Sequence, residues 1–84
     1  MTANLIHYDK VFDPSSDYAT MIDYDGGDNP VYIGKAIPGS ATSAAKWQIR
    51  KITYDGDNPT AVQFAGGGNT FGNVWDDRAT YSYS

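Results

Sequence analysis

Apolar and polar residues alternate along two neighbouring stretches of the chain, residues 47–54 and 60–65. Both stretches are rich in β-branched and aromatic residues, and they flank a cluster of turn-forming residues at 55–59. This pattern is typical of two antiparallel strands joined by a somewhat long loop. The sequence therefore predicts a β-hairpin around which the rest of the domain is arranged.

A second pair of stretches, residues 18–24 and 31–36, has the same strand character and flanks a turn-forming segment at 25–30. We predict a second hairpin there. Gly34 lies in the middle of its second strand, where the missing side chain indicates either a β-bulge or the close approach of an aromatic ring. Residues 79–83 alternate in period two and are predicted to form a terminal strand that is paired in a sheet.

The apolar residues of the first central strand change sides part-way along it. Trp47 and Ile49 point to one side, whereas Ile52 and Tyr54 point to the other. The change falls at residues 50–51. Either a bulge lies there, or both faces of the sheet are partly covered.

Two segments of the chain lack clear strand character. Residues 37–46 are predicted to form a turn followed by at most one helical turn. Residues 1–17 are predicted to be an N-terminal arm that reaches onto a neighbouring subunit, or else an edge strand or a frayed terminus. The antiparallel β domain is predicted to span residues 18–84.

The composition favours strands over helices. All ten acidic residues are aspartate, none is glutamate, and leucine occurs only at Leu5. Glutamate and leucine are strong helix formers, whereas aspartate prefers caps and turns. We therefore predict an all-β protein: a small antiparallel β-sandwich or barrel built from hairpins, with at most one short helical turn.

The small size of the chain means that association with other subunits, or an unusually aromatic core, must add to its stability. A domain of 84 residues buries only about 60 to 65 per cent of the surface of its unfolded chain. The chain has no cysteine, so disulfides cannot add stability. It has seven tyrosines, whose amphipathic rings suit protein interfaces. We expect a homo-oligomer that also contacts other proteins.

The strand pattern assigns the large apolar and aromatic residues to two groups. The predicted structural core consists of Trp47, Ile49, Ile52, Val62, Phe64, Phe71 and Trp75. The predicted interface residues are Tyr24, Tyr32, Tyr54, Tyr81 and Tyr83. The tryptophans and tyrosines of the two groups can instead stack on sugar rings, which is the alternative to core packing and interface contacts.

Charge and hydropathy exclude two classes of partner. The net charge of −4 opposes binding to a nucleic-acid backbone, which needs a basic face. No apolar run approaches the roughly 18 residues of a membrane span, and the N-terminal residues lack the charged-then-apolar order of a signal peptide. We expect a soluble protein made in the cytoplasm, with neither nucleic acid nor a membrane as its partner.

No arrangement of residues in the sequence indicates catalysis. His7 is the only histidine, and no nucleophile or carboxylate can be placed beside it. Asp76 and Asp77 are adjacent, which on a strand would send them to opposite faces. One of them is expected to pair with Arg78 or to cap backbone donors near Trp75. We predict that the protein is not an enzyme and holds no cofactor.

The aspartate-rich turns are the remaining candidates for a metal site. Residues 23–28 and 55–57 carry carboxylates, which are ligands that calcium prefers. A calcium loop needs more converging oxygens, often with a bidentate glutamate, and the closing position of an EF-hand register falls here on Gly34 or Gly66. The pattern favours ordinary turn chemistry, and we predict no metal site.

Most of the chain from about residue 30 onward resembles small structural proteins of tailed bacteriophages. The shared pattern is YxGxAxPGxxTSxAxWxIxKI, then a DGxNP turn, then FxNxWDxRxxxxY. It falls on Tyr32, Gly34, Ala36, Pro38, Gly39, Thr42, Ser43, Ala45, Trp47, Ile49, Lys51, Ile52, Phe71, Asn73, Trp75, Asp76, Arg78 and Tyr83. The chain departs from the pattern in the extra glycines at 66–68, and the N-terminal third has no counterpart.

The resemblance implies a virion component. The leading hypothesis is a structural protein of a bacteriophage particle, associated with its tail, neck or capsid, that acts through protein–protein contacts between many copies and with other virion proteins. It would be made in the host cytoplasm and located in the virion. The alternative hypothesis is a carbohydrate-binding β-module for recognition of the host surface.

Overall fold

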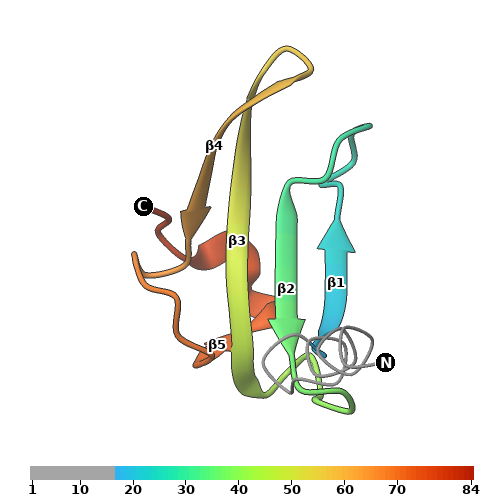
Figure 1. The fold of residues 1–84 in the computed structure, drawn as a ribbon, viewed down its shortest axis with the longest axis vertical. Helices are drawn as coiled ribbons and strands as arrows, with labels where there is room; N and C mark the ends of the chain where they lie inside the picture. The colour runs from blue at the N-terminus through green and yellow to red at the C-terminus, as the bar shows by residue number, and fades with distance from the viewer. Residues whose placement is uncertain (1–16) are drawn as a thin grey trace, which may run out of the picture.

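The structure of this chain is a computed structural model that describes residues 17–84. Within that range the chain forms strands and one short 3-10 helix (Figure 1). The elements are β1 (Ala19–Asp23), β2 (Tyr32–Ala36), β3 (Ala45–Asp55), β4 (Asn58–Phe64), β5 (Asn73–Val74) and η1 (Trp75–Thr80). The predicted N-terminal arm at residues 1–17, including His7, lies outside the described residues except for Asp17.

The strands form one five-stranded antiparallel sheet. Its order is β1-β2-β3-β4, and β5 pairs with the beginning of β3. From β1 to β4, neighbours in sequence are neighbours in the sheet, and β1–β2 and β3–β4 are the two predicted hairpins. The prediction of an all-β antiparallel fold built from hairpins, with at most one short helical turn, is confirmed for residues 17–84.

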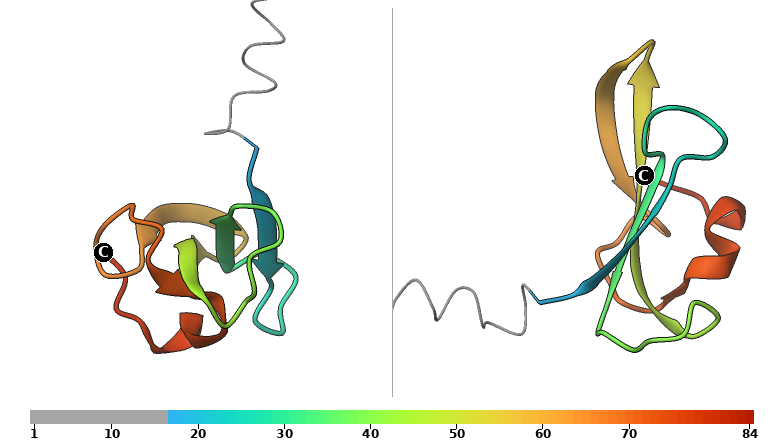
Figure 2. Two further views of the ribbon diagram at one scale, coloured as in Figure 1. Left: turned by 90° about the horizontal axis from the view of Figure 1, so that it is seen from below. Right: turned by 90° about the vertical axis from the view of Figure 1, so that its right-hand side faces the viewer.

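A small second layer covers one face of the sheet. Figure 2 shows η1 and β5 on a single side of the curved strands β1 to β4. We call the covered side the inner face and the opposite side the outer face. Among the residues that the structure describes, no strand or helix covers the outer face.

The core lies on the inner face and is built around two tryptophans. Trp47 of β3 and Trp75 of η1 are 2% and 3% exposed, and their ring centroids lie 6.0 Å apart. Tyr32, Ala36, Ile49 and Ala65 complete the cluster of buried residues. Aromatic rings bury large areas, so that two tryptophans supply much of the apolar surface that this small domain needs.

Gly34 allows the layers to approach each other. A Cβ atom added at Gly34 would lie 2.5 Å from the Trp75 ring and 3.1 Å from the Trp47 ring. Gly34 pairs in regular register with Met21 and Ile49, so the strand has no bulge there. Of the two interpretations of this mid-strand glycine, the close approach of an aromatic ring is the one observed.

The β3–β4 turn is tighter than the sequence pattern suggested. Only Gly56 and Asp57 separate the strands, and Gly56 has a φ of 63°, a left-handed conformation that glycine adopts without strain. Pro59 lies within β4 and pairs with Tyr54, and the register shifts there, between Thr53 and Tyr54. Proline lacks the N–H that a regular ladder needs.

No bulge lies at residues 50–51. The other predicted explanation applies instead: both faces of the sheet are covered next to this point. Three successive residues of β3, Trp47 to Ile49, are buried. Gln48 projects to the outer face, where its Nε2 donates a hydrogen bond of 2.8 Å to the Asn69 carbonyl oxygen. The segment between β4 and β5 therefore covers one end of the outer face.

The C-terminal segment differs from the predicted terminal strand. Residues up to Thr80 belong to η1, and strand pairing after it is limited to a bridge between Tyr83 and Ala65. The helix begins at Trp75, whose ring is buried in the core. The helical turn expected within residues 37–46 is a simple turn, closed by a hydrogen bond of 3.1 Å from the Ala44 N–H to the Ala41 carbonyl.

Candidate functional site

The predicted core residues lie on both faces of the sheet. Trp47, Ile49 and Trp75 are buried on the inner face as predicted, and Ile52 and Phe64 are half-buried. Two further assignments to the core are wrong: the exposed fractions are 55% for Val62 and 38% for Phe71. The physical reason is that alternation along a strand separates two faces but does not tell which of them is covered.

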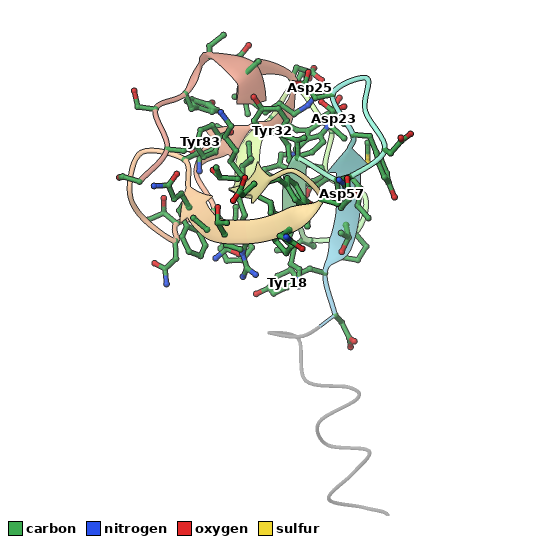
Figure 3. All side chains as sticks on the ribbon, turned by 90° about the horizontal axis from the view of Figure 1, so that it is seen from above. Tyr18, Asp23, Asp25, Tyr32, Asp57 and Tyr83 are labelled. Atoms are coloured by element: carbon green, nitrogen blue, oxygen red, sulfur yellow. The ribbon has the colours of Figure 1, made fainter. Side chains whose placement is uncertain are left out.

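Most of the predicted interface tyrosines make their contacts within the domain itself. Tyr24 is 46% exposed and is therefore accessible to a partner. Tyr32 is only 7% exposed and belongs to the core. Tyr32 packs against Tyr83, with ring centroids 5.8 Å apart. Figure 3 shows both rings on the side of the sheet that carries η1. The assignment of Tyr32 to an interface is therefore wrong.

The other three tyrosines are half-buried, and their hydroxyl groups bind the protein's own backbone. These bonds join Tyr54 to the Pro30 carbonyl, Tyr83 to the Arg78 carbonyl and Tyr81 to the Val74 N–H, at 2.6, 2.7 and 2.8 Å. A phenol that satisfies a buried backbone group while packing its ring stabilises the fold. These hydroxyl groups are therefore already engaged within the domain.

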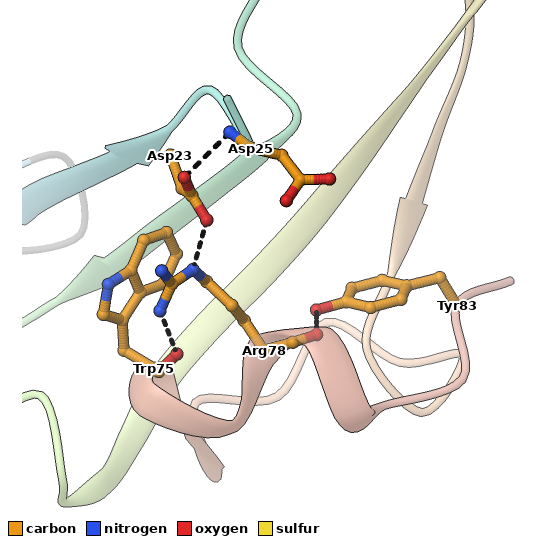
Figure 4. A network of polar contacts seen from close by, with 5 residues as sticks. All are labelled: Asp23, Asp25, Trp75, Arg78 and Tyr83. Atoms are coloured by element: carbon orange, nitrogen blue, oxygen red, sulfur yellow. Dashed lines mark hydrogen bonds and ion pairs between the residues drawn. The ribbon is translucent and has the colours of Figure 1, made fainter. Parts of the chain in front are cut away.

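A polar network attaches η1 to β1 (Figure 4). Arg78 Nε donates to Asp23 Oδ2 at 2.7 Å, and Arg78 Nη1 donates to the Trp75 carbonyl at 3.1 Å. The guanidinium lies 4.6 Å from the centroid of a Trp75 ring. From the sequence, one of Asp76 and Asp77 is expected to pair with Arg78 or to cap backbone donors near Trp75. The structure instead pairs Arg78 with Asp23, 55 positions away, and no local signal in the sequence could have indicated this pair.

Two residues of this network, Asp23 and Tyr83, have shifted pKa values. The Asp25 N–H, followed by the Arg78 guanidinium, holds the pKa of the Asp23 carboxyl below its usual value. Burial raises the pKa of the Tyr83 hydroxyl to about 12, and the neighbouring Tyr32 and Tyr81 hydroxyls act in the same direction. Both shifts favour the ionisation states that make the hydrogen bonds observed in the fold.

Replacing Asp23 by asparagine should reduce stability at neutral pH but not in acid. The pair is half-buried, so we expect the free energy of unfolding to fall by about 1 kcal/mol at pH 7. Because the folded-state pKa of Asp23 lies below its unfolded value of about 3.9, the contribution is present above that value and is lost as the pH falls through the lowered pKa. Urea denaturation of both proteins at pH 7 and pH 2 measures this.

The control for this experiment is Asp28→Asn, because Asp28 is exposed and lies in the adjoining turn. We expect the control to stay within about 0.5 kcal/mol of the wild type at pH 7. A difference between Asp23→Asn and the wild type that is as large at pH 2 as at pH 7 would contradict the assignment of the acid-sensitive contribution to this pair.

The two aspartate-rich turns lie side by side at one end of the sheet. Asn29 Nδ2 of the β1–β2 turn donates to Asp57 Oδ1 of the β3–β4 turn at 3.2 Å. In the first turn, Asp25 and Gly26 both have positive φ values, of 51° and 79°, which aspartate and glycine tolerate. Within residues 17–84, no three acidic or histidine side chains converge in a way that could hold a metal ion.

The outer face carries apolar side chains that no strand or helix of the described part of the chain covers. Strand register places Ile22 beside Ile33, and Ile52 beside Val62, on this face. Ile22 and Val62 are 52% and 55% exposed. The outer face comprises Thr20, Ile22, Ile33, Lys35, Gln48, Arg50, Ile52, Val62 and Phe64.

Arg50 lies across the middle of the outer face. Its guanidinium carbon is 5.1 Å from the centroid of the Phe64 ring, and its Nη2 donates to Gln48 Oε1 at 3.0 Å. The Arg50 Nε atom is buried and has no hydrogen-bond partner among residues 17–84. An arginine over an aromatic ring places a positive charge beside the apolar side chains of this face.

A pocket adjoins one end of this face. Its lining consists of Tyr18, Ile37, Lys46 and Phe71. The Tyr18 and Phe71 rings are 4.9 Å apart between centroids, and Ile37 is 68% exposed. Figure 3 places Tyr18 on the opposite side of the sheet from η1, which is the outer side. The pocket and the outer face therefore form one apolar surface with basic residues in it.

The comparisons with known proteins give no match from which a function could be inferred. No protein-family model, no curated protein and no solved structure matches this sequence. As for membranes, residues 17–84 contain no helix that is long and apolar enough to cross one.

Proposed function

We propose that this chain is a structural component of a tailed-bacteriophage particle and works through protein–protein contacts between many copies. The observation that carries the multi-copy part of the proposal is the outer face, with Ile22 and Val62 more than half exposed. Apolar surface of this kind on a small domain marks an interaction site. The assignment to a phage particle rests on the resemblance of the sequence, in particular the WxIxKI and WDxR segments.

In this proposal the protein has no catalytic task. It is located in the virion after synthesis in the host cytoplasm, and its partners are further copies of itself and other virion proteins. Burial of the outer face in an assembly would remove Ile22 and Val62 from water, at about 25 cal/mol for each Å² of apolar area. This burial would add stability that the small domain lacks alone.

The experiment for this proposal has two parts. Mass spectrometry of purified phage particles should find the chain in many copies per particle. Sedimentation of the purified protein should show species larger than the monomer as its concentration rises. Absence of the chain from particles would overturn the assignment to the virion, and a monomer at all concentrations would overturn self-association.

A second candidate function is carbohydrate binding for recognition of the host surface. The observation that favours it is the pocket lined by Tyr18, Ile37, Lys46 and Phe71, where two aromatic rings lie at the surface. Sugar rings stack on such aromatic faces. The tryptophans do not contribute to a glycan surface, since both are buried in the core.

A glycan array followed by titration tests this second function. Phe71→Ala should abolish any binding, whereas Tyr24→Ala, at a somewhat more exposed aromatic residue that does not line the pocket, should leave it unchanged. An array without hits would remove the carbohydrate-binding hypothesis.

A further inference from the structure

Charge is distributed unequally between the two sides of the molecule. Residues 17–84 contain five lysines and arginines. Lys35 and Arg50 belong to the outer face, and Lys46 lines the adjoining pocket. None of the residues that form the outer face or the pocket is an aspartate. In a chain with a net charge of −4, this side is therefore locally basic.

The opposite side of the molecule is acidic. Asp76 and Asp77 are exposed on the first turn of η1, and their side chains make no hydrogen bond with any other described residue. Neither of the two cations on this side forms an ion pair with Asp76 or Asp77. Arg78 is paired with Asp23, and the Lys51 ammonium lies 5.8 Å from the centroid of the Tyr32 ring.

This asymmetry selects between two ways of joining identical copies. A two-fold arrangement that pairs outer face with outer face would bring the patch that holds Lys35, Lys46 and Arg50 against the same positively charged patch of the partner. Like charges juxtaposed in an interface cost several kcal/mol. An arrangement that places the outer face against η1 of the next copy brings those cations toward Asp76 and Asp77 instead.

We propose that copies of this chain stack head to tail, with the outer face of one copy against the η1 side of the next. The inference rests on the proposed multi-copy function and specifies its interface. The apolar residues Ile22 and Val62 supply the buried area, and the charges on the two sides set the orientation. A head-to-tail interface is not self-limiting, so the copies form a closed ring or an open filament.

Two complementary variants test the stacking. Ile22→Gln with Val62→Gln removes apolar surface from the outer face without adding charge. Asp76→Lys with Asp77→Lys makes the η1 side repel the outer face. We expect each variant by itself to self-associate at least about tenfold more weakly than the wild type in sedimentation velocity. Every contact of the stack joins an outer face to an η1 side, and each variant has lost the binding ability of one of these two sides.

The mixture of the two variants is the decisive sample. Each molecule then has one competent side, so we expect a one-to-one heterodimer that does not grow further. The control is Asp28→Lys with Asp55→Lys, which changes the net charge by the same amount in the β1–β2 turn and at the end of β3 and should assemble like the wild type. Circular dichroism establishes that each variant is folded.

Cross-linking of the wild type tests the same interface and does not depend on whether the variants fold. In a mixture of isotope-labelled and unlabelled protein, a carbodiimide should link Lys35 or Lys46 of one copy to Asp76 or Asp77 of another. Links from residues 1–16 to the outer face within one chain would assign that face to the N-terminal segment and overturn the proposal.

The outcomes separate this inference from the proposed function. If the wild type assembles but the lysine variant of η1 assembles equally well, or the mixture contains no heterodimer, the stacking is wrong while the multi-copy function stands. If the wild type remains monomeric at every concentration, self-association itself fails, and the stacking fails with it.

Discussion

A Gly34→Ala variant is expected to lose about 3 kcal/mol of its free energy of unfolding. The added Cβ would lie 2.5 Å from the Trp75 ring and 3.1 Å from the Trp47 ring, so at least one ring must move. Both rings are buried and packed against each other, which leaves them little space to adjust. Small domains have about 5 to 15 kcal/mol in total, and the loss should be evident in a urea denaturation curve.

Two further variants show whether the loss arises from this contact. Gly72→Ala is the matched control, because a Cβ at Gly72 meets nothing within 4 Å, and we expect a change within about 0.5 kcal/mol. In a Trp75→Leu background the smaller side chain leaves room, so Gly34→Ala should cost much less there. Equal costs in both backgrounds would contradict the role given to the ring.

Replacing Trp47 by alanine is expected to cost about 4 kcal/mol and to leave little folded protein. Trp47 is 2% exposed, and its Nε1–H donates a hydrogen bond of 3.0 Å to the Ala41 carbonyl. The change therefore empties the centre of the core and also releases the segment between β2 and β3. Thermal denaturation followed by circular dichroism measures the effect.

Two companion variants accompany Trp47→Ala. One separates the contribution of the aromatic ring from that of its hydrogen bond, and the other is a control at an exposed site. Trp47→Phe retains an aromatic ring but loses the donor to Ala41, so we expect a smaller loss of about 1 to 3 kcal/mol. Ile37→Ala, at a site that is 68% exposed, should change stability by less than about 0.5 kcal/mol. If Trp47→Ala were no more harmful than Ile37→Ala, the core would not be centred on this ring.

The strands and turns could be predicted because their signals are local. The segments predicted at 18–24, 31–36 and 47–54 correspond to β1, β2 and β3, with ends displaced by a few residues. Period-two alternation and clusters of aspartate, glycine and proline act within a few positions of the chain. The role of Gly34 was also accessible, since few causes account for a glycine in mid-strand.

The candidate site could be predicted only in part. Tyr24 was rightly considered a surface residue, but Tyr32 is buried, while Val62 is exposed on the face expected to be core. The segment from Trp75 onward explains these errors. It forms η1 and packs Tyr83 against Tyr32, so it buries the inner face and leaves the outer face without a covering element of the described chain.

The amino-acid order alone establishes the antiparallel strands, their hairpin pairing and the sets of side chains that share a face, since each depends on near neighbours in the chain. The folded arrangement alone reveals which face becomes the core, that Arg78 pairs with Asp23, and that Lys35 and Arg50 lie on the opposite side of the sheet from Asp76 and Asp77. These features depend on contacts between segments distant in sequence. Period-two alternation is the same for a covered and an uncovered face, so it contains no information about them.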